Sequence, residues 1–218
     1  AVRSLTVMFL EMWNAIKKTD TDYTAYFPEI TYTAKQTGYV QPYADNPLDD
    51  EHTGENVYMN VLNSAREYAY FITPYLLISD EMKKAFTLAA RRGVDVRIIT
   101  PGIPDKKFVY QATRSYYNRL VKKGVRIFEY TPGFCHAKQC VSDDKAAVVG
   151  TINLDYRSLY HHFENAAAFY HKDAVAGVKA DFDHLFEECH EVTEQYRSHR
   201  STVLRIGQCI LRLFAPLL

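Results

Sequence analysis

The sequence predicts an α/β domain built on a mixed, largely parallel β-sheet flanked by helices. A length of 218 residues suits one large domain, and 47% hydrophobic with 24% charged residues is the balance of a globular core. From residue 68 onward, short runs rich in β-branched and aromatic residues alternate with segments of helical length. The longest apolar runs are far shorter than the roughly 18 residues that span a bilayer, which excludes a membrane-embedded bundle.

The first part of the chain predicts a helix, a linker and then a regular alternation. Apolar residues at helical spacing indicate an amphipathic helix over 3–18, and the polar stretch after it indicates a linker. An edge strand is expected near 38–43 and a helix at about 56–66. The alternation then predicts a strand at 68–73, a helix at 79–92, a strand at 94–100, a helix at 106–123 and a strand at 125–130. Gly93 and Gly124 stand where the two helices should end.

The second part of the chain has a different pattern. Two short strands around the turn residues 143–145 predict a β-hairpin, followed by a strand near 164–170 and a long helix from 173 to about 197. The last segment, 199–218, contains arginines but no acidic residue, and its apolar residues share one helical face. A basic amphipathic helix of this kind can lie in a membrane interface and attract anionic lipid. We favour this interpretation over a helix that packs on another part of the protein.

The stretch GFCHAKQCVSDDKAAVVGTINLDYRS contains the residues suited to chemistry. On a strand, His136 and Lys138 project from the same face because side chains alternate with period two. Gly150 and Thr151 follow the next strand, where a small residue lets the backbone approach a ligand, and Asn153 adds an amide. Phosphoryl transfer uses this combination: the imidazole attacks phosphorus or protonates the leaving group, and the cation and amide stabilise negative oxygen.

The spacing His-x-Lys-x4-Asp-x6-Gly-Thr-x-Asn, from His136 to Asn153, resembles the signature of the phospholipase D superfamily. The flanking sequences resemble the second, C-terminal catalytic repeat of bacterial cardiolipin synthases over essentially the whole chain. Members of that family carry two such motifs and this chain has one, so we expect the first repeat upstream of Ala1. The expected organisation is a helix and linker from the preceding repeat at 1–36, a catalytic repeat at 37–198 and a membrane-proximal tail at 199–218.

The resemblance implies a reaction and its setting. One phosphatidylglycerol donates its phosphatidyl group to a histidine, glycerol leaves, and the hydroxyl of a second phosphatidylglycerol takes the group to form cardiolipin. Two histidines face each other, one as phosphohistidine and the other as acid and base, with neither metal nor cofactor. In a two-repeat enzyme His136 is the acid–base group, whereas in a homodimer of single-motif chains either copy can attack. The implied location is the bacterial cell membrane, with peripheral attachment through the C-terminal helix.

Three further positions have specific expectations. Asp143 belongs to the catalytic signature, but it has the opposite strand parity to His136 and lies at the turn, which favours a structural role. Glu164 is the expected partner of the far ring nitrogen of His136, because a carboxylate commonly sets a catalytic tautomer. Tyr75 follows a strand end, where ligands collect in open α/β sheets, so it either lines the substrate pocket or packs in the core. A zinc site at His136 is rejected, because its cysteine neighbour points to the other face and no fourth ligand is at hand.

Three other functions compete with this interpretation. A phospholipase that lets water attack the intermediate would carry the same motif. A superfamily nuclease would also carry it, but 26 basic and 26 acidic residues leave no positive surplus for a nucleic-acid backbone. A non-catalytic repeat is disfavoured by the intact His136, Lys138 and Asn153. The expected partners are phosphatidylglycerol and other anionic phospholipids, a membrane surface, and the first repeat or a second copy of the chain, with no nucleic acid.

Overall fold

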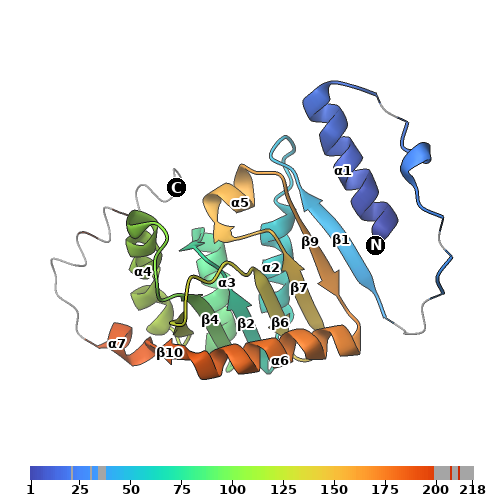
Figure 1. The fold of residues 1–218 in the computed structure, drawn as a ribbon. Helices are drawn as coiled ribbons and strands as arrows, with labels where there is room; N and C mark the ends of the chain where they lie inside the picture. The colour runs from blue at the N-terminus through green and yellow to red at the C-terminus, as the bar shows by residue number, and fades with distance from the viewer. Residues whose placement is uncertain (21, 30, 34–37, 199–206, 208–210, 212–218) are drawn as a thin grey trace.

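The computed structural model describes residues 1–20, 22–29, 31–33, 38–198, 207 and 211. A broad sheet forms the centre, helices lie on both of its faces, and helix α1 lies beside one edge (Figure 1). The helices are α1 (Val2–Lys17), the 3-10 turn η1 (Thr24–Tyr26), α2 (Thr53–Ser64), α3 (Asp80–Arg91), α4 (Lys107–Val121), α5 (Tyr156–Tyr160), α6 (Lys172–Glu188) and α7 (Thr193–Arg197). The strands are β1 (Val40–Asp45), β2 (Tyr68–Ile72), β3 (Leu76–Leu77), β4 (Asp95–Pro101), β5 (Arg126–Tyr130), β6 (Gln139–Ser142), β7 (Ala146–Gly150), β8 (Leu154–Asp155), β9 (Glu164–Phe169) and β10 (Cys189–Glu191).

The large sheet has the strand order β1-β9-β7-β6-β2-β4-β5-β10 within the described part of the chain. The predicted mixed α/β fold with flanking helices is confirmed, but the sheet is less parallel than expected. Strands β2, β4 and β5 run parallel, because the helices α3 and α4 carry the chain back between them. The other neighbours are antiparallel, from β1 to β2 at one side and between β5 and β10 at the other. The tight turn between β6 and β7 can join only antiparallel strands.

Each face of the sheet has its own hydrophobic core. Helices α2, α3 and α4 cover one face, and α6 runs across the other (Figure 1). Strand β4 illustrates the division: Val96 and Ile98 pack with the first core, whereas Ile99 packs with Phe182 of α6 in the second. This alternation is the period of two that a strand buried on both faces requires.

The predicted elements are confirmed except near the C-terminus, where the expected helix over 173–197 is interrupted. Helix α6 ends at Glu188, and β10 pairs antiparallel with the edge of β5 before α7 begins. Pairing with β10 satisfies backbone groups that the edge strand would otherwise expose. The hydroxyl of Thr193 also accepts the backbone N–H of Ile127 at 3.0 Å, which ties the start of α7 to β5.

The predicted tail at 199–218 lies outside the described residues, apart from positions 207 and 211. Within the described ranges, no helix combines the length and the apolar character that crossing a bilayer requires.

Candidate active site

His136 and Lys138 lie in the extended segment that leads into β6, at the end of the sheet from which α5 also projects. Strand β6 is held on both sides, by β2 and by β7. The carbonyl of Lys138 accepts the N–H of Gly150 at 3.2 Å, which extends this pairing beyond the strand itself. The Lys138 ammonium donates to the carbonyl of His136 at 2.6 Å. The imidazole and the ammonium are therefore held at the same end of the sheet, although both residues precede β6 and neither lies on a strand as the sequence predicted.

Gly150 brings strand β7 close to β9. A Cβ at this position would lie 2.4 Å from the Cβ of Ala166 and 2.5 Å from the carbonyl oxygen of Asn165, so a larger residue does not fit without movement. Thr151 continues the contact, because its N–H donates to the Asn165 carbonyl at 2.8 Å and its hydroxyl accepts the Asn165 N–H at 3.0 Å. The same hydroxyl contacts the Glu164 carboxylate. The glycine thus serves close packing of two strands, and Thr151 places Glu164.

Asn153 lies in a loop held by two buried anchors. The Tyr58 hydroxyl donates to the carbonyl of Ile152 at 2.8 Å, and strand β8 pairs in parallel with β3 directly after the loop. The Asn153 side chain hydrogen-bonds to Asp155, which lowers the pKa of that carboxyl against the larger opposing effect of burial. The carboxamide oxygen of Asn153 is buried and has no hydrogen-bond partner among the described residues. A ligand group that donates a hydrogen bond would satisfy this oxygen.

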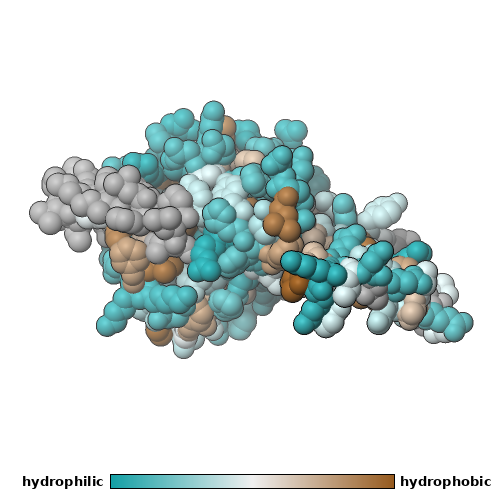
Figure 2. Space-filling model, turned by 90° about the horizontal axis from the view of Figure 1, so that it is seen from above, coloured by the Kyte–Doolittle hydropathy of each residue, from teal (hydrophilic) through white to brown (hydrophobic). Residues whose placement is uncertain are grey.

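Two clefts meet at His136, Asn153 and Glu164. The first cleft has a volume of about 480 Å³, and it is lined by His136, Ala137, Lys138, Gln139, Val149, Gly150, Thr151, Asn153 and Glu164. The second has a volume of about 280 Å³, and it is lined by Tyr75, Leu77, Lys106, Val109, His136, Asn153, Asp155, Arg157, Ser158, His162 and Glu164. The structure thus brings every predicted site residue except Asp143 to one place, and Tyr75 lines the second cleft, where its hydroxyl hydrogen-bonds to Asp105. Seen from this end, the body of the molecule is mainly hydrophilic (Figure 2).

Burial and a neighbouring charge favour the neutral form of His136. Partial burial lowers the pKa of the imidazole below 6.5, the Lys138 ammonium lowers it further, and Asp105 opposes both. Burial also lowers the pKa of Lys138, while Glu164 and Asp155 act to keep it charged. A neutral imidazole suits either attack on phosphorus or acceptance of a proton from an attacking hydroxyl, and the retained positive charge suits stabilisation of the non-bridging oxygens.

Glu164 does not hold His136 as expected. Its carboxylate contacts the Thr151 hydroxyl, and it lies 4.0 Å from Nδ1 of His162. The predicted pairing with the far ring nitrogen of His136 is therefore not formed in this structure. Glu164 still lines both clefts, so its charge acts on the site from close by.

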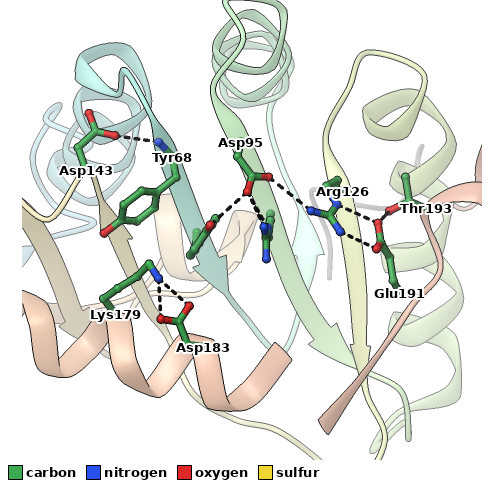
Figure 3. Close-up of polar contacts among 10 residues, drawn as sticks. Tyr68, Asp95, Arg126, Asp143, Lys179, Asp183, Glu191 and Thr193 are labelled. Carbon is green, nitrogen blue, oxygen red and sulfur yellow. Dashed lines mark hydrogen bonds and ion pairs between the residues drawn. The ribbon is translucent and has the colours of Figure 1, made fainter. Parts of the chain in front are cut away.

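Asp143 lies at the other end of β6 from His136, in the hairpin turn, with a φ of 53°. Its carboxylate accepts the backbone N–H groups of Arg66 at 2.7 Å and of Glu67 and Tyr68 at 2.9 Å each. Figure 3 shows the contact with Tyr68. Asp143 thus connects the hairpin to the start of β2. Grouping it with the catalytic residues was wrong, and the structural role that its strand parity favoured is the observed one.

Sequence reasoning missed several residues of the second cleft. Arg157 and Asp155 follow Asn153 closely, so their proximity in sequence was a usable signal. His162 follows another histidine in the sequence, and it lines the cleft beside Arg157. Lys106 precedes His136 by a whole helix and a strand, and no local pattern marks it.

Solved structures share this fold. Nuc from Salmonella typhimurium, a phospholipase D family member, matches 76% of this chain and 100% of its own with a TM-score of 0.60 and 16% identity. Phosphatidylserine synthase from Haemophilus influenzae matches 82% of this chain and 45% of its own with a TM-score of 0.65 and 16% identity. At such identities the likeness concerns the fold alone, and it defines the class of the chain as a phospholipase D-like α/β fold.

The family follows from the sequence match. Residues 58–186 match the family described as "Cardiolipin synthase, PLD-like domain", and the chain belongs to this family. An uncharacterized Streptococcus mutans protein is 47% identical over 217 residues, and cardiolipin synthase from Geobacillus sp. is 34% identical over 219 residues. The match covers 100% of this chain in both cases, but 47% and 43% of the two relatives. The chain thus spans less than half the length of these relatives.

Proposed function

We propose that this chain is the second catalytic repeat of a cardiolipin synthase, with a phosphatidyltransferase activity that uses His136. In this proposal residues 1–36 come from the preceding repeat, 37–198 form the catalytic repeat and 199–218 contact the membrane. Family membership supports the proposal, and so do relatives named cardiolipin synthase. The observation that carries it is the meeting of two clefts at His136, beside Lys138 and Asn153.

The proposed reaction has two steps at one phosphorus. A neutral histidine attacks the phosphodiester of one phosphatidylglycerol, the bond to glycerol breaks, and a second, protonated histidine gives its proton to the departing oxygen. The hydroxyl of a second phosphatidylglycerol then attacks, its proton returns to the second histidine, and the phosphorus–nitrogen bond breaks. Lys138 stabilises the negative oxygens throughout. Phosphodiesters are both consumed and formed, so the exchange needs no nucleotide.

In a two-repeat enzyme we assign His136 the acid–base role, and in a homodimer the two copies are equivalent. The first repeat or a second copy supplies the other histidine. The proposed substrates are anionic phospholipids, and the proposed location is the bacterial cell membrane, with peripheral contact through 199–218. Water in place of the second lipid would give hydrolysis to phosphatidic acid, so the product identifies the acceptor.

The test is the substitution His136→Gln in the complete enzyme that contains this chain. We expect a loss of cardiolipin formation from phosphatidylglycerol vesicles of at least about a hundredfold, because one proton-transfer or nucleophilic group is removed. His161→Gln is the matched control, since His161 is exposed and lines neither cleft. Product is quantified by mass spectrometry, and thermal unfolding checks that both variants fold. Cardiolipin made by the His136 variant at the wild-type rate would exclude the proposal.

A further inference from the structure

The second cleft contains two positive side chains that the mechanism does not use. Lys106 directly precedes α4, and Arg157 lies in α5. Both residues are exposed, and both line the cleft that ends at His136. We call these two residues the basic wall.

The basic wall lacks internal counter-ions. Some arginines of the described chain are paired with carboxylates, such as Arg126 with Glu191 at 2.7 Å and Arg114 with Glu129 at 2.7 Å (Figure 3 shows the first). The ion pairs among the described residues include neither Lys106 nor Arg157. Two exposed cations without carboxylate partners, facing one cleft, favour an anionic ligand there.

The contact with His162 leaves the positive charge of Arg157 available to an anionic ligand. One guanidinium nitrogen lies 3.2 Å from Nε2 of His162. A guanidinium only donates hydrogen bonds, so Nε2 accepts, and the ring carries its proton on Nδ1, the nitrogen nearer Glu164. His162 carries no negative charge. It orients Arg157 without neutralising it.

The carboxylates of the cleft are occupied by internal contacts. Asp155 is 4% exposed and accepts the N–H of Ser158 at 2.8 Å as the N-cap of α5. The Glu164 side chain is 11% exposed and contacts Thr151. These two carboxylates are largely buried, whereas the cations of the basic wall are accessible from solvent.

The orphaned oxygen of Asn153 adds a second requirement. It is buried at the junction of the two clefts and has no partner among the described residues. A carboxamide oxygen accepts hydrogen bonds only, so its partner must be a donor such as a hydroxyl. A buried acceptor without a partner is costly, and ligand binding would remove that cost.

We propose that the second cleft is the acceptor subsite and takes a phosphate ester that carries a free hydroxyl. Arg157 and Lys106 bind the phosphate, and the hydroxyl donates to Asn153 beside His136. The first cleft then holds the donor phosphorus next to Lys138. This inference rests on the proposed function and deepens it, because it assigns acceptor choice to residues outside the signature. Occupation of the cleft by the acceptor also displaces water, which favours transfer over hydrolysis.

The activity test uses Arg157→Ala and Lys106→Ala in the complete enzyme, with three acceptors offered to one labelled phosphatidylglycerol donor. The acceptors are phosphatidylglycerol in vesicles, soluble glycerol phosphate and neutral glycerol. We expect kcat/KM for both phosphate-bearing acceptors to fall about tenfold in each variant, and the ratio of transfer to hydrolysis to fall with it. Arg157→Lys should recover part of the loss. A larger wild-type rate with the vesicle lipid than with glycerol phosphate identifies a lipid headgroup as the source.

Controls and a binding measurement separate the possible failures. Arg119→Ala and Lys123→Ala remove exposed charges from α4 and its end, away from the cleft residues, and should leave acceptor choice unchanged. Glycerol phosphate binding is measured by titrating the histidine ring resonances, and the affinity should fall about tenfold in Arg157→Ala. Binding that depends on Arg157 without any turnover would overturn the proposed function and support the subsite. Equal losses of kcat/KM with all three acceptors would overturn the subsite. An affinity for glycerol phosphate that is unchanged in both variants would also overturn it.

Discussion

At the scale of single residues, the charge of Lys138 acts directly on His136. The two side chains are two positions apart, and the ammonium also hydrogen-bonds to the His136 carbonyl. Burial and this positive charge both lower the pKa of the imidazole, and Asp105 opposes them. At neutral pH the ring is therefore held ready to accept a proton or to attack.

Replacing the ammonium should raise the pKa of His136. In Lys138→Met the imidazolium no longer faces a positive neighbour, so its protonation becomes easier and the pKa moves back toward 6.5. Any step that needs neutral His136 then loses activity at a higher pH than in the wild type. Titration of the His136 ring by NMR measures the shift, with Lys145→Met at the exposed hairpin turn as the control. An unchanged or lower pKa in Lys138→Met would contradict the coupling.

At the scale of elements, the hairpin of β6 and β7 is attached to the sheet through Asp143. Three backbone N–H groups from the loop before β2 and from its first residue converge on one carboxylate. Burial raises the pKa of Asp143, but the three donors outweigh it and hold the pKa below its usual value. Its left-handed backbone conformation is one that Asp and Asn adopt more easily than most residues.

Asp143→Asn should therefore lower stability in a pH-dependent way. We expect a loss of about 1–3 kcal/mol at neutral pH, because charge-assisted hydrogen bonds are weakened while the backbone preference is kept. The pKa of Asp143 is lower in the folded protein than in the unfolded chain, where it is about 3.9. The ionised carboxylate therefore stabilises the fold at pH values above about 3.9, and this stabilisation is lost as the pH falls through the pKa of the folded protein. The difference from wild type should thus shrink in acid. Urea unfolding at several pH values measures it, and Asp144→Asn, at the next residue, is the control.

Gly150 allows a second prediction at the element scale. In Gly150→Ala the new methyl would overlap Ala166 and the Asn165 carbonyl, so β7 and β9 must separate at a cost of about 1–3 kcal/mol. Gly177→Ala is the opposite case, because nothing lies within 4 Å of that position in α6 and alanine favours helix by about 0.5–1 kcal/mol. Thermal unfolding should show opposite signs for the two variants. Equal stability of Gly150→Ala and wild type would mean that the strands are less tightly packed than described.

The local sequence pattern predicted most helices and strands, and it failed where pairing with a distant segment decides the structure. The strands β2, β4 and β5 and the helices α3 and α4 follow from periodicity and glycine stop signals, whereas the short strand β3 was not predicted. The break between α6 and α7 did not follow, because Cys189–Glu191 continues a helical pattern yet pairs with the open edge of β5. Strand direction was also misjudged in part, since direction depends on which strands become neighbours.

At the scale of the whole molecule, α1 leaves an apolar stripe exposed. The stripe consists of Val2, Leu5, Phe9, Trp13 and Ile16, each at least 44% exposed. Phe9 and Trp13 stack within it, with ring centroids 6.1 Å apart. Contiguous exposed apolar surface of this kind marks an interaction surface.

In the isolated chain we expect a second copy to cover this stripe. Phe9→Glu should weaken self-association by at least about tenfold, because burial of an aromatic ring stabilises the contact and a charge prevents it. Sedimentation measures the mass, and the emission of Trp13, the single tryptophan, reports burial of the stripe. Leu88→Glu, at a leucine of α3 that is 43% exposed, is the control. A chain that stays monomeric at all concentrations would contradict this expectation.

The sequence by itself determined most of the element types and the signature residues His136, Lys138 and Asn153, because periodicity and motif spacing act within short stretches of chain. Only the tertiary structure decided which groups share a cleft. Lys106 and Arg157 come from different helical regions and meet because α4 and α5 lie at the same end of the sheet. The tertiary structure also places Asp143 away from the site, because β6 is extended and His136 and Asp143 flank its opposite ends. There the Asp143 carboxylate accepts three backbone N–H groups at the start of β2.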